Sequence, residues 1–149
     1  MLNWGRDTGW QTSLRVIDWS KSLDAYGRAW NEPDRAERVR LLAGALADGC
    51  RYTDSGFDAT GAEGIADVID AYHERFAAFV IRPTSVVDGH HDVIRFTWAY
   101  TATENGETVE VDGADTILLD DDGRLRRIVV FDGAHPVSIG PATDDGSSS

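Results

Sequence analysis

Apolar residues recur at helical spacing in the first half of the chain, which predicts helices there. Between residues 18 and 49, two stretches place apolar side chains three or four positions apart. The first predicted helix begins at Asp18 and ends at Asn31-Glu32-Pro33; its stripe consists of Trp19, Leu23, Tyr26 and Trp30. The second begins at Pro33, which a first helical turn tolerates, and stops at Asp48-Gly49. Its buried face is expected to hold Val39, Leu42, Ala45 and Leu46.

A longer third helix is predicted to run from Thr60 to Arg82, after a short strand from Cys50 to Asp54. Thr60 and Glu63 have the spacing of a capping box, in which each side chain bonds a backbone N–H of the first turn. The helical stripe consists of Ile65, Val68, Ile69, Tyr72, Phe76 and Phe79. Pro83 ends the helix, because proline disfavours helical backbone in the residue before it.

After Pro83, apolar and polar residues alternate, as expected for a sheet with one buried face. Four antiparallel strands are predicted: residues 84–88, residues 92–103, a run after the Asn105-Gly106 hairpin signal, and residues 125–132. Ile94, Phe96, Trp98 and Tyr100 share one face of the second of these strands. Helices followed by strands predict an α+β fold of three N-terminal helices packed on a curved sheet.

The chain has 149 residues, a length that suits one domain. We assign residues 18–134 to this domain, residues 1–17 to an N-terminal arm that contains Trp4 and Trp10, and residues 135–149 to a flexible tail with nothing to bury. No stretch approaches the ~18 apolar residues of a membrane span, and the N-terminus does not resemble a secretion signal. These features predict a cytoplasmic protein.

Charge and residue usage exclude several classes of function. A net charge of −12 disfavours binding to nucleic acid or to an anionic membrane surface. A single cysteine, Cys50, excludes an intramolecular disulfide and a cysteine-rich zinc site. The four histidines lack metal-ligand spacing, and no glycine-rich phosphate loop is present, so we expect neither a metal nor a cofactor.

Asp115 is the most informative polar residue, because alternation places it on an apolar face. The other residues of that face are Val109, Val111, Ile117 and Leu119. A carboxyl group in such surroundings must be paired or protonated, since burial disfavours its charged form. It can therefore act as a hydrogen-bond donor or as a general base that titrates nearer neutral pH. The structural alternative is that Asp115 accepts a hydrogen bond from a Trp, Tyr or Arg side chain inside the fold.

The order of elements and several local motifs resemble the nuclear transport factor 2-like, or SnoaL-like, superfamily. The motifs are Tyr26-Gly27-Arg28-Ala29-Trp30-Asn31, Asp48-Gly49-Cys50-Arg51-Tyr52-Thr53-Asp54 and Asp121-Asp122-Gly123-Arg124-Leu125. The resemblance implies a cystatin-like cone whose mixed or antiparallel sheet curls around the helices to enclose an apolar pocket. Such pockets bind small, largely apolar ligands. The expected walls of this pocket are Trp30, Tyr52, Phe96, Trp98 and Phe131, with His73 and Asp132 as polar groups.

The resemblance to ketosteroid isomerases within this superfamily implies three catalytic residues. Tyr26 falls at the position of the tyrosine that stabilises an oxyanion, Asp54 at that of the proton-shuttling base, and Asp115 at that of a protonated aspartic acid. Compared with SnoaL-type cyclases, Val130 occupies the position of the catalytic acid, and Asp132 faces the same way two residues later. The Arg-x-Asp pair of epoxide hydrolases is not found on the expected strand.

Three functional hypotheses follow. The first is a cofactor-free isomerase, cyclase or lyase that acts on a small hydrophobic carbonyl compound. The second is a protein that binds an apolar ligand without chemistry. The third is an interaction module, since the convex face of such a sheet often forms a homodimer in this superfamily; Arg95, Thr97 and Thr101 would lie on that face.

Overall fold

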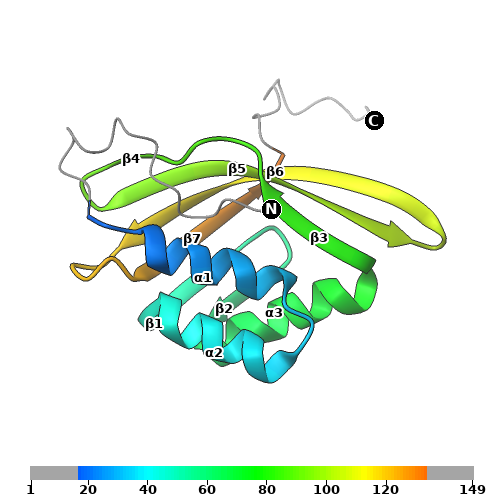
Figure 1. Cartoon of the computed structure of the whole chain (residues 1–149), viewed down its shortest axis with the longest axis horizontal. Coiled ribbons are helices and arrows are strands. Elements are labelled where there is room, and N and C mark those ends of the chain that lie inside the picture. The colour runs from blue at the N-terminus through cyan, green and yellow to red at the C-terminus, as the bar shows by residue number, and fades with distance from the viewer. Residues whose placement is uncertain (1–16, 134–149) are drawn as a thin grey trace, which may run out of the picture.

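A computed structural model describes residues 17–133 as three helices and seven strands (Figure 1). The helices are α1 (Ser20–Asn31), α2 (Arg35–Ala45) and α3 (Gly61–Arg75). The strands are β1 (Leu46–Thr53), β2 (Asp58–Thr60), β3 (Ala77–Pro83), β4 (Asp88–His90), β5 (Val93–Glu104), β6 (Glu107–Leu119) and β7 (Leu125–Asp132). The predicted N-terminal arm and C-terminal tail fall almost entirely outside the described residues.

The strands form one mixed sheet in the order β2-β1-β7-β6-β5-β3, with β4 paired to β5. Only β1 and β7 run parallel; the other paired strands are antiparallel. The long strands β5 and β6 bend over the three helices, which lie together on the concave side (Figure 1). This arrangement confirms the predicted α+β class and the curved mixed sheet. Among the described residues, no helix is long and apolar enough to cross a membrane.

The first two helices occur where the periodicity predicts them, although their ends differ. In α1 the predicted stripe is buried. The helix α2 begins after Asp34, whose side chain accepts a hydrogen bond from the backbone N–H of Glu37 at 2.9 Å. Pro33 therefore precedes the helix instead of opening it. The helix ends at Ala45, because Leu46 already pairs with Leu125 of β7.

The predicted third helix is too long at its C-terminal end. It stops at Arg75, and Ala77–Pro83 forms β3, which pairs with β5. A bulge lies between Ala77 and Val80, and Ala78 adopts a positive φ of 54° there. Phe76 and Phe79 lie three positions apart, a spacing typical of a helix, and both side chains are buried. The bulge, not a helical turn, places both of them on the buried side. The predicted capping box is also wrong, because the Thr60 side chain makes no capping hydrogen bond.

Candidate functional site

A small cavity lies between the helices and the concave face of the sheet. Its lining consists of Tyr26, Trp30, Tyr52, Tyr72, Phe79, Ile81, Phe96, Trp98, Tyr100, Asp115, Val130 and Asp132. Its volume is about 30 Å³, counted as the space open to the centre of a water molecule. That is room for about one or two waters. The large apolar pocket that the resemblance implies is therefore mostly filled, because aromatic side chains from two helices (α1 and α3) and three strands (β1, β3 and β5) converge there.

Asp115 lies on β6 and points into this cavity. It pairs with Phe96 of β5 and Val130 of β7, and only 4% of its surface is exposed. The indole N–H of Trp98 donates a hydrogen bond to its Oδ1 at 2.7 Å. Trp98 can lie over β6 because its partner there is Gly113, where an added Cβ would fall 2.1 Å from the indole ring. Among the described residues, Trp98 is the only hydrogen-bond partner of the Asp115 carboxyl group.

Burial is the main reason that the pKa of Asp115 rises from 3.8 to about 7. The hydrogen bond from Trp98 opposes this rise, and the nearby charge of Asp54 adds to it. The hydrogen bond from a Trp side chain, which is the structural alternative for Asp115, is thus observed. The other carboxyl oxygen of Asp115 receives no hydrogen bond from residues 17–133. A carboxyl group that titrates near neutral pH can both accept and return a proton.

Tyr26 on α1 also lines the cavity and is 3% exposed. Burial, followed by the charge of Asp115, raises its pKa well above the ordinary value. The hydroxyl therefore remains protonated and can serve as a hydrogen-bond donor.

Asp54 does not line the cavity, although it lies directly behind two tyrosines that do. Its Oδ2 accepts from the hydroxyls of Tyr52 at 2.6 Å and Tyr72 at 3.0 Å, and its Oδ1 accepts from the backbone N–H groups of Gly56 and Phe57, both at 2.8 Å. A carboxylate offers about four acceptor positions. These four donors occupy them, and they hold Tyr52 and Tyr72 in place.

Asp132, at the end of β7, lies at the rim of the cavity. Its Oδ2 accepts from the Ser55 hydroxyl at 2.7 Å, which connects the end of β7 to the loop after β1. Asp132, Tyr72 and Tyr100 also line a second, larger hollow of about 420 Å³. We call this second space the mouth hollow; its remaining lining residues are Ser55, Gly56, Phe57, Ala71, Arg75, Phe76, Glu104, Val109 and Val111.

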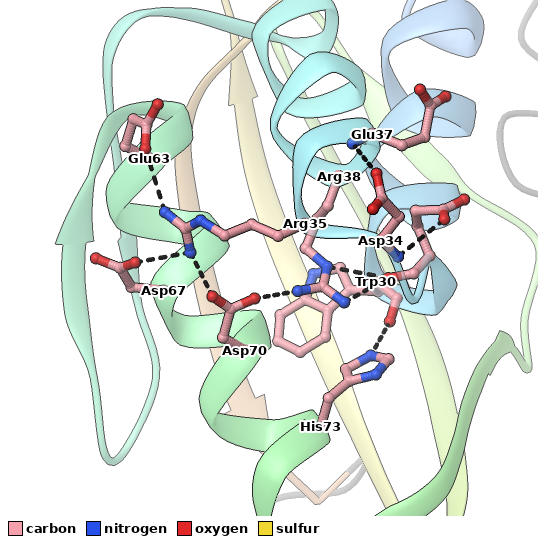
Figure 2. Close-up of polar contacts among 10 residues, drawn as sticks. Trp30, Asp34, Arg35, Glu37, Arg38, Glu63, Asp67, Asp70 and His73 are labelled. Carbon is pink, nitrogen blue, oxygen red and sulfur yellow. Dashed lines mark hydrogen bonds and ion pairs between the residues drawn. The ribbon is translucent and has the colours of Figure 1, made fainter.

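The end of α1 around the wall residue Trp30 is held by contacts from α2, α3 and β3, of which Figure 2 shows those from α2 and α3. His73 Nε2 lies 2.7 Å from the Trp30 carbonyl oxygen, to which it donates. The neighbouring Asn31 side chain pairs with the backbone N–H and C=O of Ile81 at 2.8 and 2.9 Å. Buried Arg38 donates to the Glu32 carbonyl and forms an ion pair with Asp70 of α3. His73 thus supports Trp30 from behind and does not line the cavity, contrary to the predicted pocket role.

Phe131 is also misplaced by the sequence-based prediction. It is 61% exposed and lines a groove on the outer face of the sheet, where it pairs with Ala114. The reason is the alternation in β7: Ile128 and Val130 point inward, so Phe131 points outward. Asp132 faces inward with Val130, as the sequence predicted.

Other lining residues were not among the predicted ones: Tyr72, Phe79, Ile81, Tyr100 and Val130. The alternation of β5 could have identified Tyr100, and the stripe of α3 could have identified Tyr72. Phe79 and Ile81 required recognition of β3. Within residues 17–133, no group of three or more His, Cys, Asp or Glu side chains could hold a metal ion, and no Lys, Arg or His lines the cavity.

Comparisons with known proteins agree with this architecture. Among solved structures, a proposed isomerase of the SnoaL-like family from Agrobacterium tumefaciens C58 is 31% identical, with a TM-score of 0.67 over 76% of this chain and 95% of that one. A proposed SnoaL-like polyketide cyclase from Jannaschia sp. CCS1 is 16% identical (TM-score 0.60, 75% and 85% covered). A ketosteroid isomerase-like protein from Catenulispora acidiphila, in complex with trimethylamine, is 15% identical (TM-score 0.62, 74% and 83% covered).

The last two likenesses show the fold alone. No curated protein matches the chain significantly. The model of the SnoaL-like domain matches residues 23–128, a span that contains all three helices except the first residues of α1 and nearly the whole sheet. The chain therefore belongs to the SnoaL-like domain family.

Proposed function

We propose that the protein is a cofactor-free acid–base enzyme that isomerises or cyclises a small hydrophobic carbonyl compound, with Asp115 as the group that transfers the proton. One observation carries the proposal: a buried carboxyl group with a single hydrogen-bond donor and a pKa of about 7 faces an aromatic cavity. The descriptions of the Agrobacterium and Jannaschia proteins as a proposed isomerase and a proposed cyclase support the same class of chemistry.

In this mechanism the ionised Asp115 removes a proton from the carbon next to the carbonyl group. The electron pair of that C–H bond moves toward the carbonyl, and Tyr26 donates a hydrogen bond to the enolate oxygen that forms. The protonated Asp115 then returns the proton to a different carbon, so that isomerisation needs no net gain or loss of protons.

The assignment differs from the roles that the ketosteroid isomerase resemblance implies. There, Asp54 is the base and Asp115 is a permanent donor. The four donors on Asp54 leave none of its acceptor positions for a substrate proton, so we assign Asp54 to positioning Tyr52 and Tyr72. A substrate larger than about two waters requires the aromatic side chains at the rim to move apart.

The first test uses β,γ-unsaturated cyclic ketones, beginning with 3-cyclohexen-1-one, whose conjugation is followed by ultraviolet absorbance. We expect kcat/KM to rise with pH through about 7 as Asp115 ionises. Asp115→Asn should lower kcat/KM by a factor of about 10²–10⁴. Asp121→Asn, which removes one charge from an exposed turn, is the matched control. Equal turnover by wild type and Asp115→Asn across the ketone panel would refute the mechanism.

A second candidate function is ligand binding or protein interaction without chemistry. The small volume of the cavity favours it, since Trp30, Trp98 and Tyr100 fill much of the space that a substrate would need. In that case apolar ligands bind equally well to wild type and Asp115→Asn, and no ketone is converted. Light scattering on the same preparations tests the homodimer, which remains a prediction.

A further inference from the structure

The mouth hollow has an aromatic wall. The rings of Phe57, Tyr72, Phe76 and Tyr100 form a connected row, with neighbouring centroids 5.5 to 6.4 Å apart. The protein already places one cation on this wall: the guanidinium carbon of Arg75 lies 4.7 Å from the centroid of the Phe76 ring. Aromatic faces attract cations at this range. Glu104, at 2.9 Å, balances the charge of Arg75.

A second carboxylate in the mouth hollow has no such partner. Asp132 accepts one hydrogen bond, from Ser55, and within residues 17–133 it forms no ion pair. Its charge acts on the adjoining rings: burial first, and Asp132 after it, raises the pKa of Tyr100, and Asp132 also contributes to the raised pKa of Tyr72. The potential at this part of the hollow is therefore negative.

The aromatic wall and the carboxylate without an ion-pair partner in residues 17–133 together indicate which chemical class of ligand fits the mouth hollow. An anion would be repelled by Asp132. A bare metal ion would need several oxygen or nitrogen ligands, and no group of three or more His, Cys, Asp or Glu side chains gathers there among the described residues. An alkylammonium ion matches both features, because its methyl or methylene groups pack on aromatic faces while its charge is balanced by a carboxylate.

We propose that the mouth hollow binds the alkylammonium group of a small organic cation, with Asp132 as its counter-ion and the rings of Tyr72 and Tyr100 as its apolar contacts. This site shares Asp132, Tyr72 and Tyr100 with the lining of the cavity, but binding of a cation there does not depend on proton transfer at Asp115. The volume of about 420 Å³ accommodates such a group without movement of the inner aromatic side chains.

The test is isothermal titration calorimetry of the full chain with choline and with 3,3-dimethylbutan-1-ol, in low-salt phosphate buffer. The two probes have the same shape, but the alcohol has a carbon atom where choline has its charged nitrogen. We expect choline to bind roughly tenfold more tightly, and added sodium chloride to reduce the difference. Equal affinities, or no binding of choline, would overturn the proposal.

Asp132→Asn locates the charge that is responsible. The asparagine Oδ1 can still accept from Ser55, so the loop contact is retained while the charge is removed. We expect choline affinity to fall toward that of the neutral alcohol, and Asp121→Asn, with the same change in net charge, to keep the affinity of wild type. If Asp132→Asn binds choline as wild type does, the mouth hollow is not the site.

Discussion

Within the described part of the chain, the carboxylate at the contact between α2 and α3 is paired with cations, whereas the buried carboxyl group in the cavity is not. Asp70 of α3 forms ion pairs with two guanidinium groups, those of Arg35 and Arg38 (Figure 2). Asp115, which is more deeply buried, receives one indole N–H and no cation from residues 17–133. The same type of side chain therefore fixes the helices in one region, where it is fully paired, and remains able to titrate near pH 7 in the other.

The largest effect is expected where a paired carboxylate is removed. Asp70→Ala leaves the guanidinium of Arg38, which is 3% exposed, without its charged partner. Loss of one partner of a buried ion pair costs about 3–5 kcal/mol of unfolding free energy. Denaturant unfolding measures this cost, and Glu63→Ala, which removes an exposed partner of Arg35, is the control. A loss similar to that of the control would show that the two regions do not differ in this way.

The next effect concerns the dependence of stability on pH. Since burial raises the pKa of Asp115 from 3.8 to about 7, the folded protein binds a proton between these pH values that the unfolded chain lacks. The unfolding free energy that Asp115 contributes therefore falls as pH rises through this window, and it stays low above it. The total change is about 4 kcal/mol.

Asp115→Asn isolates this contribution because asparagine does not titrate. The difference in unfolding free energy between wild type and variant, measured at pH 4 to 8, should shift by that amount in favour of the variant. Other carboxylates cancel in the difference. A flat difference would mean that Asp115 titrates normally.

The smallest of the three effects tests the indole N–H of Trp98, the single hydrogen-bond donor from residues 17–133 to the Asp115 carboxyl group. Trp98→Phe removes the N–H that stabilises the ionised form of Asp115, so its pKa should rise further above about 7. Above that pH, the unpaired carboxylate should cost an additional ~1–2 kcal/mol of unfolding free energy. Infrared difference spectra at increasing pH follow the carboxyl C=O band of Asp115, which is identified by its absence in Asp115→Asn. An unchanged midpoint in Trp98→Phe would contradict the role of the indole.

Most of the fold could be predicted from the sequence because its elements follow clear periodicity. The stripe of α1, the alternation of β5 and β6, and the inward position of Asp115 all depend on one period each. The end of α3 could not be predicted in this way. Phe76 and Phe79 have the sequence spacing of a helix, but a bulge at Ala78 is what places both side chains on the buried side.

The candidate site was predictable in part for the same reason. Alternation along β6 and β7 identified Asp115 and Asp132, but whether a residue such as Asp54 is free to react depends on partners distant in sequence. Its bond from Tyr72 crosses 18 positions, and no local pattern encodes it. The volume of the cavity likewise depends on how eight aromatic side chains pack together, which spacing along the chain does not determine.

The Asn31 side chain also affects how copies of this protein behave at high concentration. Strand β3 lies at one edge of the sheet, and an exposed edge offers unpaired N–H and C=O groups to which a strand from another molecule can add. By bonding both backbone groups of Ile81, the amide of Asn31 occupies the middle of that edge as a neighbouring strand would. One side chain at the end of a helix thereby occupies backbone groups of the β3 edge that a strand from another molecule would need.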